Sequence, residues 1–252
     1  MAELPETPDK VFPVDPLHQF QIHSIVPVNV GGVDLSFTNS ALWMAIAIGL
    51  IGLFFVLATG GRQLVPGRLQ SVAELMYEIV ANMVRDNVGT EGRRYFPFVF
   101  TLFMFTLFGN VLGIIPHSFT YTSHIIVTFF MAFVIFIAVT VIGFARHGLG
   151  FLRLFFPHGA PLWTSVILVP IELISYLSRP VSLSVRLFAN MMAGHIMLKV
   201  FAGFVLLMGL AGVVPLAALV GITVLELLVA VLQAYIFTIL TCVYLHDAIH
   251  LH

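Results

Sequence analysis

The sequence predicts an all-α integral membrane protein with about five transmembrane helices, one amphipathic surface helix and a long, steeply tilted C-terminal helical hairpin. Of its 252 residues, 60% are apolar and only 9% are charged, whereas a soluble domain has roughly 25% charged residues. The excess apolar surface must therefore face membrane lipid. Long apolar runs recur along the chain, and the few charged residues inside them gather in the last two runs.

Composition also excludes several functional classes. The formal net charge is −1, which argues against a nucleic acid partner. We find no Gly-rich phosphate loop, nucleophile triad or Cys/His cluster with metal-ligand spacing, so we expect no catalytic site, no bound metal and no cofactor. The opening of the chain is acidic and proline-rich and lacks a basic region followed by an apolar stretch, so we expect no cleavable signal or transit peptide.

The whole chain, residues 1–252, is expected to form one membrane domain that begins with a tail over residues 1–40. An uninterrupted apolar run follows the tail and predicts a first span over residues 41–59, because a helix of about 20 apolar residues crosses a bilayer. Two further runs predict spans over residues 96–115 and 125–145.

The segment between the first two spans, residues 68–86, has a different character. Its apolar residues recur at the helical spacing i, i+3, i+4, i+7, and they are Val72, Leu75, Met76, Ile79, Val80, Met83 and Val84. Polar residues take the other face, so the segment is amphipathic and too polar to span. We expect a helix lying flat on one membrane surface; the alternative is a small helix outside the membrane.

The last two apolar segments are too long for perpendicular spans. Residues 162–208 and 213–246 would extend about 70 Å and about 50 Å as helices, whereas the hydrocarbon core is about 30 Å thick. They are therefore expected to form an inclined helical hairpin, with kinks at Pro170 and Pro180.

The distribution of basic residues predicts the orientation of the chain in the membrane. The segment between the first two spans carries Arg62, Arg68, Arg85, Arg93 and Arg94, and Arg146 and Arg153 follow the third span. The opposite loops, residues 116–124 and 209–215, contain no Lys or Arg. The N-terminus is therefore expected outside, and the amphipathic helix and the C-terminus inside.

Polar residues inside the hairpin are the candidate functional residues, because charges in a span are costly and usually functional. The first arm contains a stripe of polar residues spaced three or four apart, which is about 27 Å long on a helix: Glu172, Ser175, Arg179, Ser182, Arg186 and Asn190. His195 and Lys199 follow in the same arm, and Glu226 and Gln233 share one face of the second arm. The two polar stripes could line aqueous cavities or face another subunit.

Each candidate also has a purely structural alternative. Arg186 stays charged and could simply pair with Glu172 or Glu226. Those carboxyl groups and the imidazole of His195 can exchange protons, or each could satisfy one neighbour in the core. Asn190 and Gln233 can position water or a charged partner but do not ionise, and Arg179 and Lys199 could snorkel to the interface from helix ends.

A stretch of the first arm, SRPVSLSVRLFANMMAGH over residues 178–195, resembles the signature of subunit a of the F-type ATP synthase. The most specific part is RLFAN, which begins at Arg186, followed by AGH, which ends at His195. Supporting matches are NVLGIIP over residues 110–116 and ELLVAVLQAYIFTIL over residues 226–240. The resemblance covers roughly residues 20–250 and is closest to the alphaproteobacterial and mitochondrial form of the family.

This resemblance implies that the last two helices pack against a ring of c subunits. It also implies b-type peripheral stalk subunits and other ATP synthase subunits as partners, and no ATP chemistry in this chain itself. The implied proton-translocation residues are Arg186 facing the ring carboxylates, Asn190 and Gln233 beside it, Glu172 and Ser182 on the inward path, and His195 and Glu226 on the outward path.

The positions of His195 and Glu226 carry a second implication. In many bacterial members the first position is a glutamate and the second a histidine, whereas here the two residue types are exchanged. An exchange that keeps one acid and one imidazole predicts that the two side chains lie near each other.

The mechanism implied by the resemblance has two aqueous half-channels, neither of which crosses the membrane alone. A proton crosses on a carboxylate of the rotating ring, and Arg186 is the electrostatic gate between the half-channels. His195 and Glu226 favour protons as the coupling ion. We expect a bacterial inner membrane rather than a mitochondrial one, with the N-terminus periplasmic and the C-terminus cytoplasmic.

Two other functional classes remain open at this point. An ion-coupled secondary transporter would use buried charges similarly, but it usually shows internal repeats, and we find none in this sequence. A haem-carrying membrane cytochrome would need axial histidines inside the spans, where His195 is the one histidine clearly placed. An absorption spectrum distinguishes the second class.

Overall fold

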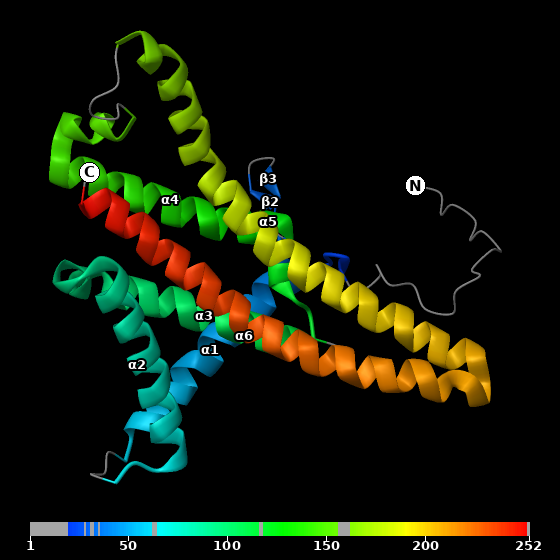
Figure 1. The fold of residues 1–252 in the computed structure, drawn as a ribbon. Coiled ribbons are helices and arrows are strands. Elements are labelled where there is room, and N and C mark those ends of the chain that lie inside the picture. Colours follow the sequence, from blue (N-terminus) through cyan, green and yellow to red (C-terminus); the bar gives the residue numbers. More distant parts are fainter. Residues whose placement is uncertain are drawn as a thin grey trace.

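The computed structural model describes residues 20–27, 29–30, 33–34, 36–61, 65–115, 118–155 and 162–250. These residues form six long helices (Figure 1): α1 (Asn39–Thr59), α2 (Arg68–Val88), α3 (Phe96–Ile114), α4 (Ile125–His147), α5 (Leu162–Met208) and α6 (Val213–Ile249). Within the described part of the chain, five helices are long and apolar enough to cross a membrane, and α2 is not among them. The predicted fold class is therefore confirmed.

Helix α6 is the centre of the bundle. One side of it packs against α2 and α3, where Val84, Phe103 and Ala234 belong to one buried cluster. Its other side packs against α4 and α5 in a second cluster that includes Leu187 and Ala230. Ala230 and Ala234 are fully buried, and such small residues let neighbouring helices approach closely. The core therefore lies on both sides of α6.

The C-terminal hairpin consists of α5 and α6, which run side by side and are joined by η5 (Gly209–Gly212). Gly209 begins the turn with a φ of +55°, a backbone conformation that glycine adopts without strain. Helix α5 remains continuous through Pro170 and Pro180, and its ribbon changes direction in its first half (Figure 1). A proline inside a helix removes one backbone hydrogen bond and bends the helix in this way.

The apolar stripe of the amphipathic helix α2 divides between two environments. Val80 and Val84 are buried against α3 and α6, whereas Val72, Leu75 and Ile79 are exposed. Only part of the predicted lipid-facing surface is therefore covered by protein. The remaining apolar side is free to contact lipid, as expected for a helix at a membrane surface.

Three helices end later than the predicted ranges. Helix α2 continues to Val88, where Gly89 stops it with a φ of +81°, and α4 continues to His147. Helix α6 continues to Ile249 because Ala248 and Ile249 are buried in the two clusters. Burial in the bundle extends these ends beyond the point where the sequence becomes polar.

Short strands precede α1, in a region expected to be a tail. Strand β1 (Ser24–Val26) pairs antiparallel with β4 (Phe37–Thr38), and β2 (Asn29–Val30) pairs antiparallel with β3 (Val33–Asp34). The side chain of Asn39, the first residue of α1, hydrogen-bonds the backbone of two residues ahead of β1. This region is therefore tethered to the start of the first span.

Candidate functional site

A buried acid–imidazole pair links the two arms of the hairpin. His195 of α5 is 7% exposed and Glu226 of α6 is 4% exposed. The Nδ1 atom of His195 lies 3.5 Å from Oε1 of Glu226. The structure thus confirms the prediction that these two side chains are close.

Gly194 creates the space for this pair. A Cβ atom at Gly194 would lie 2.8 Å from Oε1 of Glu226 and 3.1 Å from its Cδ, which is closer than non-bonded carbon and oxygen atoms approach. A larger residue at this position would therefore displace the Glu226 carboxyl group from its place against the backbone of α5. Both oxygens of Glu226 are buried and accept no hydrogen bond from the described residues.

Thr120 completes the surroundings of the imidazole. This residue lies between α3 and the short helix η3 (Tyr121–Ser123), and its Oγ1 is 3.0 Å from Nε2 of His195. The ring of Phe20 also meets the imidazole edge-on, with centroids 6.3 Å apart. Sequence reasoning missed Thr120, because a loop threonine far along the chain from His195 carries no pattern that marks it.

A cavity of about 750 Å³ opens beside His195. Its polar lining includes Gln21, His23, Asn39 and Ser118, and Lys199 lies in its wall on the hairpin side. Apart from Lys199 of α5, these residues come from the segment just before β1, the start of α1 and the loop after α3, at the end of the bundle whose described loops lack arginine. The cavity therefore reaches His195 from this end of the bundle.

Arg186 has the opposite environment, because it is exposed on the outer face of the hairpin. Its neighbours Val181 and Val185 are 48% and 42% exposed, so the surrounding surface is apolar. Among the described residues, no ion pair forms at Arg186. Glu226 instead contacts His195, and Glu172 lies about 21 Å away along α5 at 1.5 Å per residue. The structure therefore does not show Arg186 paired with Glu172 or Glu226.

The remaining candidates lie at different depths. Ser182 is exposed, and Glu172 and Asn190 are half-buried, so this part of the stripe follows the outer side of α5. Gln233 is buried on α6. Asn110 of α3, part of a recognised motif but not singled out from the sequence, donates from Nδ2 to the carbonyl of Ala230 at 3.2 Å. This contact places the buried Asn110 side chain against α6, between Glu226 and Gln233.

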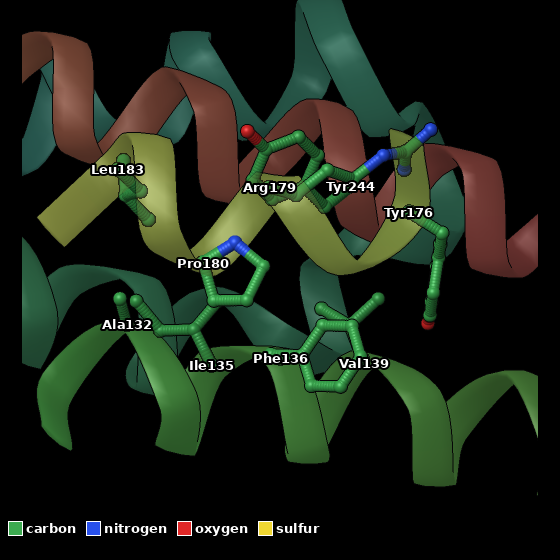
Figure 2. Close-up of a pocket in the computed structure, with 9 residues that line it drawn as sticks. All are labelled: Ala132, Ile135, Phe136, Val139, Tyr176, Arg179, Pro180, Leu183 and Tyr244. Carbon is green, nitrogen blue, oxygen red and sulfur yellow. The ribbon is translucent and has the colours of Figure 1, made fainter. Parts of the chain in front are cut away.

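Arg179 forms a second polar link between the arms. Its Nη1 donates to Oδ2 of Asp247 at 2.9 Å, and its guanidinium lies 5.4 Å from the ring centroid of Tyr176 and 5.1 Å from that of Tyr244. In Figure 2 the ring of Pro180 points toward α4, while Arg179 extends toward α6. Arg179 does not lie at a helix end, which was the premise of the snorkelling alternative, because α5 continues through this position.

The fold and this site define a polytopic membrane protein with ionisable residues concentrated in a C-terminal hairpin. A family model described as ATP synthase A chain matches residues 41–246. The chain therefore belongs to the ATP synthase subunit a family, as the resemblance predicted.

Individual relatives support the same conclusion. The ATP synthase subunit a of Paramagnetospirillum magneticum is 63% identical over 245 residues, which cover 94% of this chain and 99% of that protein. The same subunit of Rhodospirillum rubrum is 63% identical over 238 residues with the same coverage. That of Parvibaculum lavamentivorans is 57% identical over 246 residues and covers 95% of each chain. The predicted similarity to alphaproteobacterial members is confirmed.

Proposed function

We propose that this chain is the proton-translocating, non-catalytic subunit a in the membrane sector of an ATP synthase. In this proposal it forms two aqueous half-channels that deliver protons to, and collect them from, the carboxylates of a c-subunit ring. Arg186 separates the half-channels electrostatically.

The observation that carries this proposal is the exposed guanidinium of Arg186 on an apolar face. A charge facing lipid in a span is costly, and a permanent cation cannot escape that cost by losing its proton. A carboxylate on a second membrane subunit would compensate it. The exposed apolar residues of α6 beside this face fit a helical partner such as a c-subunit ring: Val224, Leu228, Val231, Leu232 and Tyr235.

A positive charge at this position has two effects on protons. It favours the ionised form of an approaching ring carboxylate and so promotes release of its proton. It also repels a hydronium ion that would otherwise pass directly between the half-channels. Because the guanidinium does not deprotonate, Arg186 is a gate and not a relay.

The cavity beside His195 supports an outward half-channel. It is open and has polar side chains among mostly apolar ones, and His195 lines it. Glu226 lies behind His195, 3.5 Å from its Nδ1 atom, so a proton could pass from the cavity to this pair. Asn190 and Gln233 would flank the gate. Glu172 and Ser182, toward the start of α5, would line the inward path.

The proposal also includes the partners and the orientation of the chain. Membrane lipid surrounds the spans, and b-type peripheral stalk subunits and other ATP synthase subunits are the further partners. The arginines of α2 and of the end of α4 favour the cytoplasmic side for their end of the bundle. In this proposal the N-terminus is periplasmic and the C-terminus cytoplasmic in a bacterial inner membrane.

Replacing Arg186 tests the proposal in vesicles that carry the assembled complex. We expect Arg186→Ala to abolish ATP-driven proton pumping and to raise passive proton leak, while the complex still assembles. Arg68→Ala, at the exposed start of α2, is the matched control and should pump normally. Full pumping by the Arg186→Ala complex would show that the guanidinium is not the gate.

A further inference from the structure

We propose that Thr120 is a positioning residue that fixes the tautomer of His195, so that Nδ1 of the imidazole is the nitrogen that exchanges a proton with Glu226. This inference deepens the proposed function, because it rests on His195 and Glu226 forming the outward proton path. It assigns a role to a loop residue that touches neither the ring face nor the gate.

The argument begins with the single hydrogen of the Thr120 hydroxyl. Oγ1 of Thr120 donates to the carbonyl oxygen of Gly113 at 3.2 Å, and it also lies 3.0 Å from Nε2 of His195. One hydroxyl hydrogen cannot serve both contacts, but the oxygen retains lone pairs that accept. Both contacts are satisfied only when Nε2 carries a hydrogen and donates it to Oγ1.

The end of α3 holds the hydroxyl in this direction. Gly113 lies in the last turn of α3, where backbone carbonyls lack helical partners and carry partial negative charge. If the hydroxyl pointed to the imidazole instead, two acceptor oxygens would face each other at 3.2 Å. The hydroxyl of Ser118 also approaches this carbonyl, at 3.1 Å, but its single hydrogen has nearer acceptors in the carbonyls of Leu112 and Ile115, at 2.6 and 2.7 Å. The carbonyl of Gly113 therefore favours the arrangement in which Thr120 accepts from the imidazole.

Gly113 also permits this close approach. A Cβ atom at Gly113 would lie 2.5 Å from Cγ2 of Thr120 and 2.6 Å from its Oγ1. Gly194 plays the equivalent part for Glu226 on the other side of the imidazole. Two glycines thus make room for the two side chains that flank His195.

The tautomer of His195 decides whether its Nδ1 atom presents a lone pair or a hydrogen to Glu226. With the hydrogen on Nε2, a neutral His195 presents the Nδ1 lone pair to Oε1 of Glu226 at 3.5 Å. No described residue donates a hydrogen bond to that carboxyl group, and Nδ1 is its nearest ionisable atom across the hairpin. A proton exchanged within the pair would therefore pass between Oε1 and Nδ1.

The proposed step moves this proton within the pair. The O–H bond of the neutral carboxyl group breaks and an Nδ1–H bond forms, which converts two neutral groups into a carboxylate and an imidazolium. Nε2 keeps its hydrogen on Thr120 throughout. The other charged group facing the imidazole is Lys199, one turn along α5 in the wall of the same cavity. The ring of His124 also meets Phe20 edge-on, with centroids 6.5 Å apart.

Loss of the Thr120 hydroxyl would release this constraint. The imidazole could then carry its hydrogen on Nδ1 and donate it to the carboxylate of Glu226, and Nδ1 would no longer accept a proton. Thr120→Val removes the hydroxyl at nearly constant shape, and Thr120→Ser retains it. Thr128→Val is a matched control, because Thr128 is fully buried and its hydroxyl bonds the backbone carbonyls of His124 and Ile125.

The first measurement is the tautomer of His195 by solid-state ¹⁵N NMR on the assembled complex with labelled histidine. A His195→Gln complex identifies the signals of this residue by difference. We expect hydrogen on Nε2 in the native complex, in Thr120→Ser and in Thr128→Val, and a substantial Nδ1–H population in Thr120→Val. A native complex with hydrogen on Nδ1, or an unchanged tautomer in Thr120→Val, would overturn the inference.

The second measurement is ATP-driven proton pumping by the same complexes. We expect Thr120→Val to lose on the order of tenfold, which is less than the roughly 10²–10⁴-fold that a positioned proton-transfer group contributes, because His195 and Glu226 are both retained. Thr120→Ser and Thr128→Val should stay near the native rate. Native pumping by Thr120→Val despite a changed tautomer would overturn the positioning role. If His195→Gln also pumps normally, the fault lies with the proposed outward path itself, and the NMR result still decides the tautomer.

Discussion

Arg179 of α5 and Asp247 of α6 form an ion pair with 2.9 Å between Nη1 and Oδ2, toward the cytoplasmic end of the hairpin in the proposed orientation. The His195–Glu226 pair joins the same two helices toward the other end. Arg186 lies between the two links, about 10 Å from Arg179 and about 14 Å from His195 along the helix at 1.5 Å per residue. The proposed gate residue thus lies between two polar contacts that join α5 to α6.

The Arg179–Asp247 pair is expected to stabilise the hairpin measurably. The two side chains are 24% and 31% exposed, and the guanidinium is also enclosed by two tyrosine rings, so water screens the pair only in part. We expect a coupling energy of about 1 kcal/mol in a double-mutant cycle of Arg179→Gln and Asp247→Asn. Thermal unfolding of the detergent-solubilised complex provides the measurement.

The control for this cycle replaces Arg179→Gln with Arg68→Gln, an exposed arginine at the start of α2. Its effect should add independently to that of Asp247→Asn. Full additivity for the Arg179 and Asp247 substitutions as well would mean that the ion pair contributes no stability.

Gly194→Ala should disconnect the acid from the imidazole. The added methyl group would lie 2.8 Å from Oε1 of Glu226, so the carboxyl group must move away from His195. Displacements of about 1 Å at a reacting group can cost a hundredfold in rate, so we expect proton pumping to fall by roughly tenfold to a hundredfold. ATP-driven pumping in vesicles measures the loss.

Gly52→Ala is the matched control for this change, because no atom lies within 4 Å of a Cβ atom built there and α1 is not part of the hairpin. Both variants add one methyl group to a membrane-spanning helix. Equal pumping by the two variants would show that the space beside Glu226 is not needed.

The pH dependence of stability should report the burial of His124. Burial lowers the pKa of His124 below its ordinary value of 6.5, and its ring stacks on Phe119 with centroids 4.9 Å apart. The unfolded chain therefore takes up a proton at a higher pH than the folded chain does. The stability that depends on neutral His124 is therefore complete above about pH 6.5 and is lost as the pH falls below that value.

Thermal unfolding between pH 8 and pH 5 checks this expectation against His124→Phe. The phenylalanine keeps the stacking partner for Phe119 but does not titrate. The unfolding temperature of the native protein should fall more steeply with acidification than that of the variant. Parallel curves would indicate that His124 is not protonated differently in the folded and unfolded states.

The number of spans, the amphipathic character of α2 and the unusual length of α5 and α6 were all predictable from the sequence. Each depends on properties repeated along a local stretch: apolar runs long enough for a bilayer, periodicity of apolar residues and the rise of a helix. The exchange of residue types at His195 and Glu226 also predicted one contact between distant segments. The helix ends and the paired strands ahead of α1 were not predictable with the same accuracy, because packing and pairing decide them.

The sequence alone therefore determined that this is a membrane protein with charged residues concentrated in its last two helices, and which residues those are. Only the tertiary structure decided that Arg179 pairs with Asp247, that Arg186 faces outward and that Thr120 touches His195. The physical reason is that periodicity assigns a residue to a face of its own helix, whereas contacts depend on which faces meet. That meeting is decided by the packing of α6 between its neighbours and by small residues such as Gly194 that let side chains from another element enter.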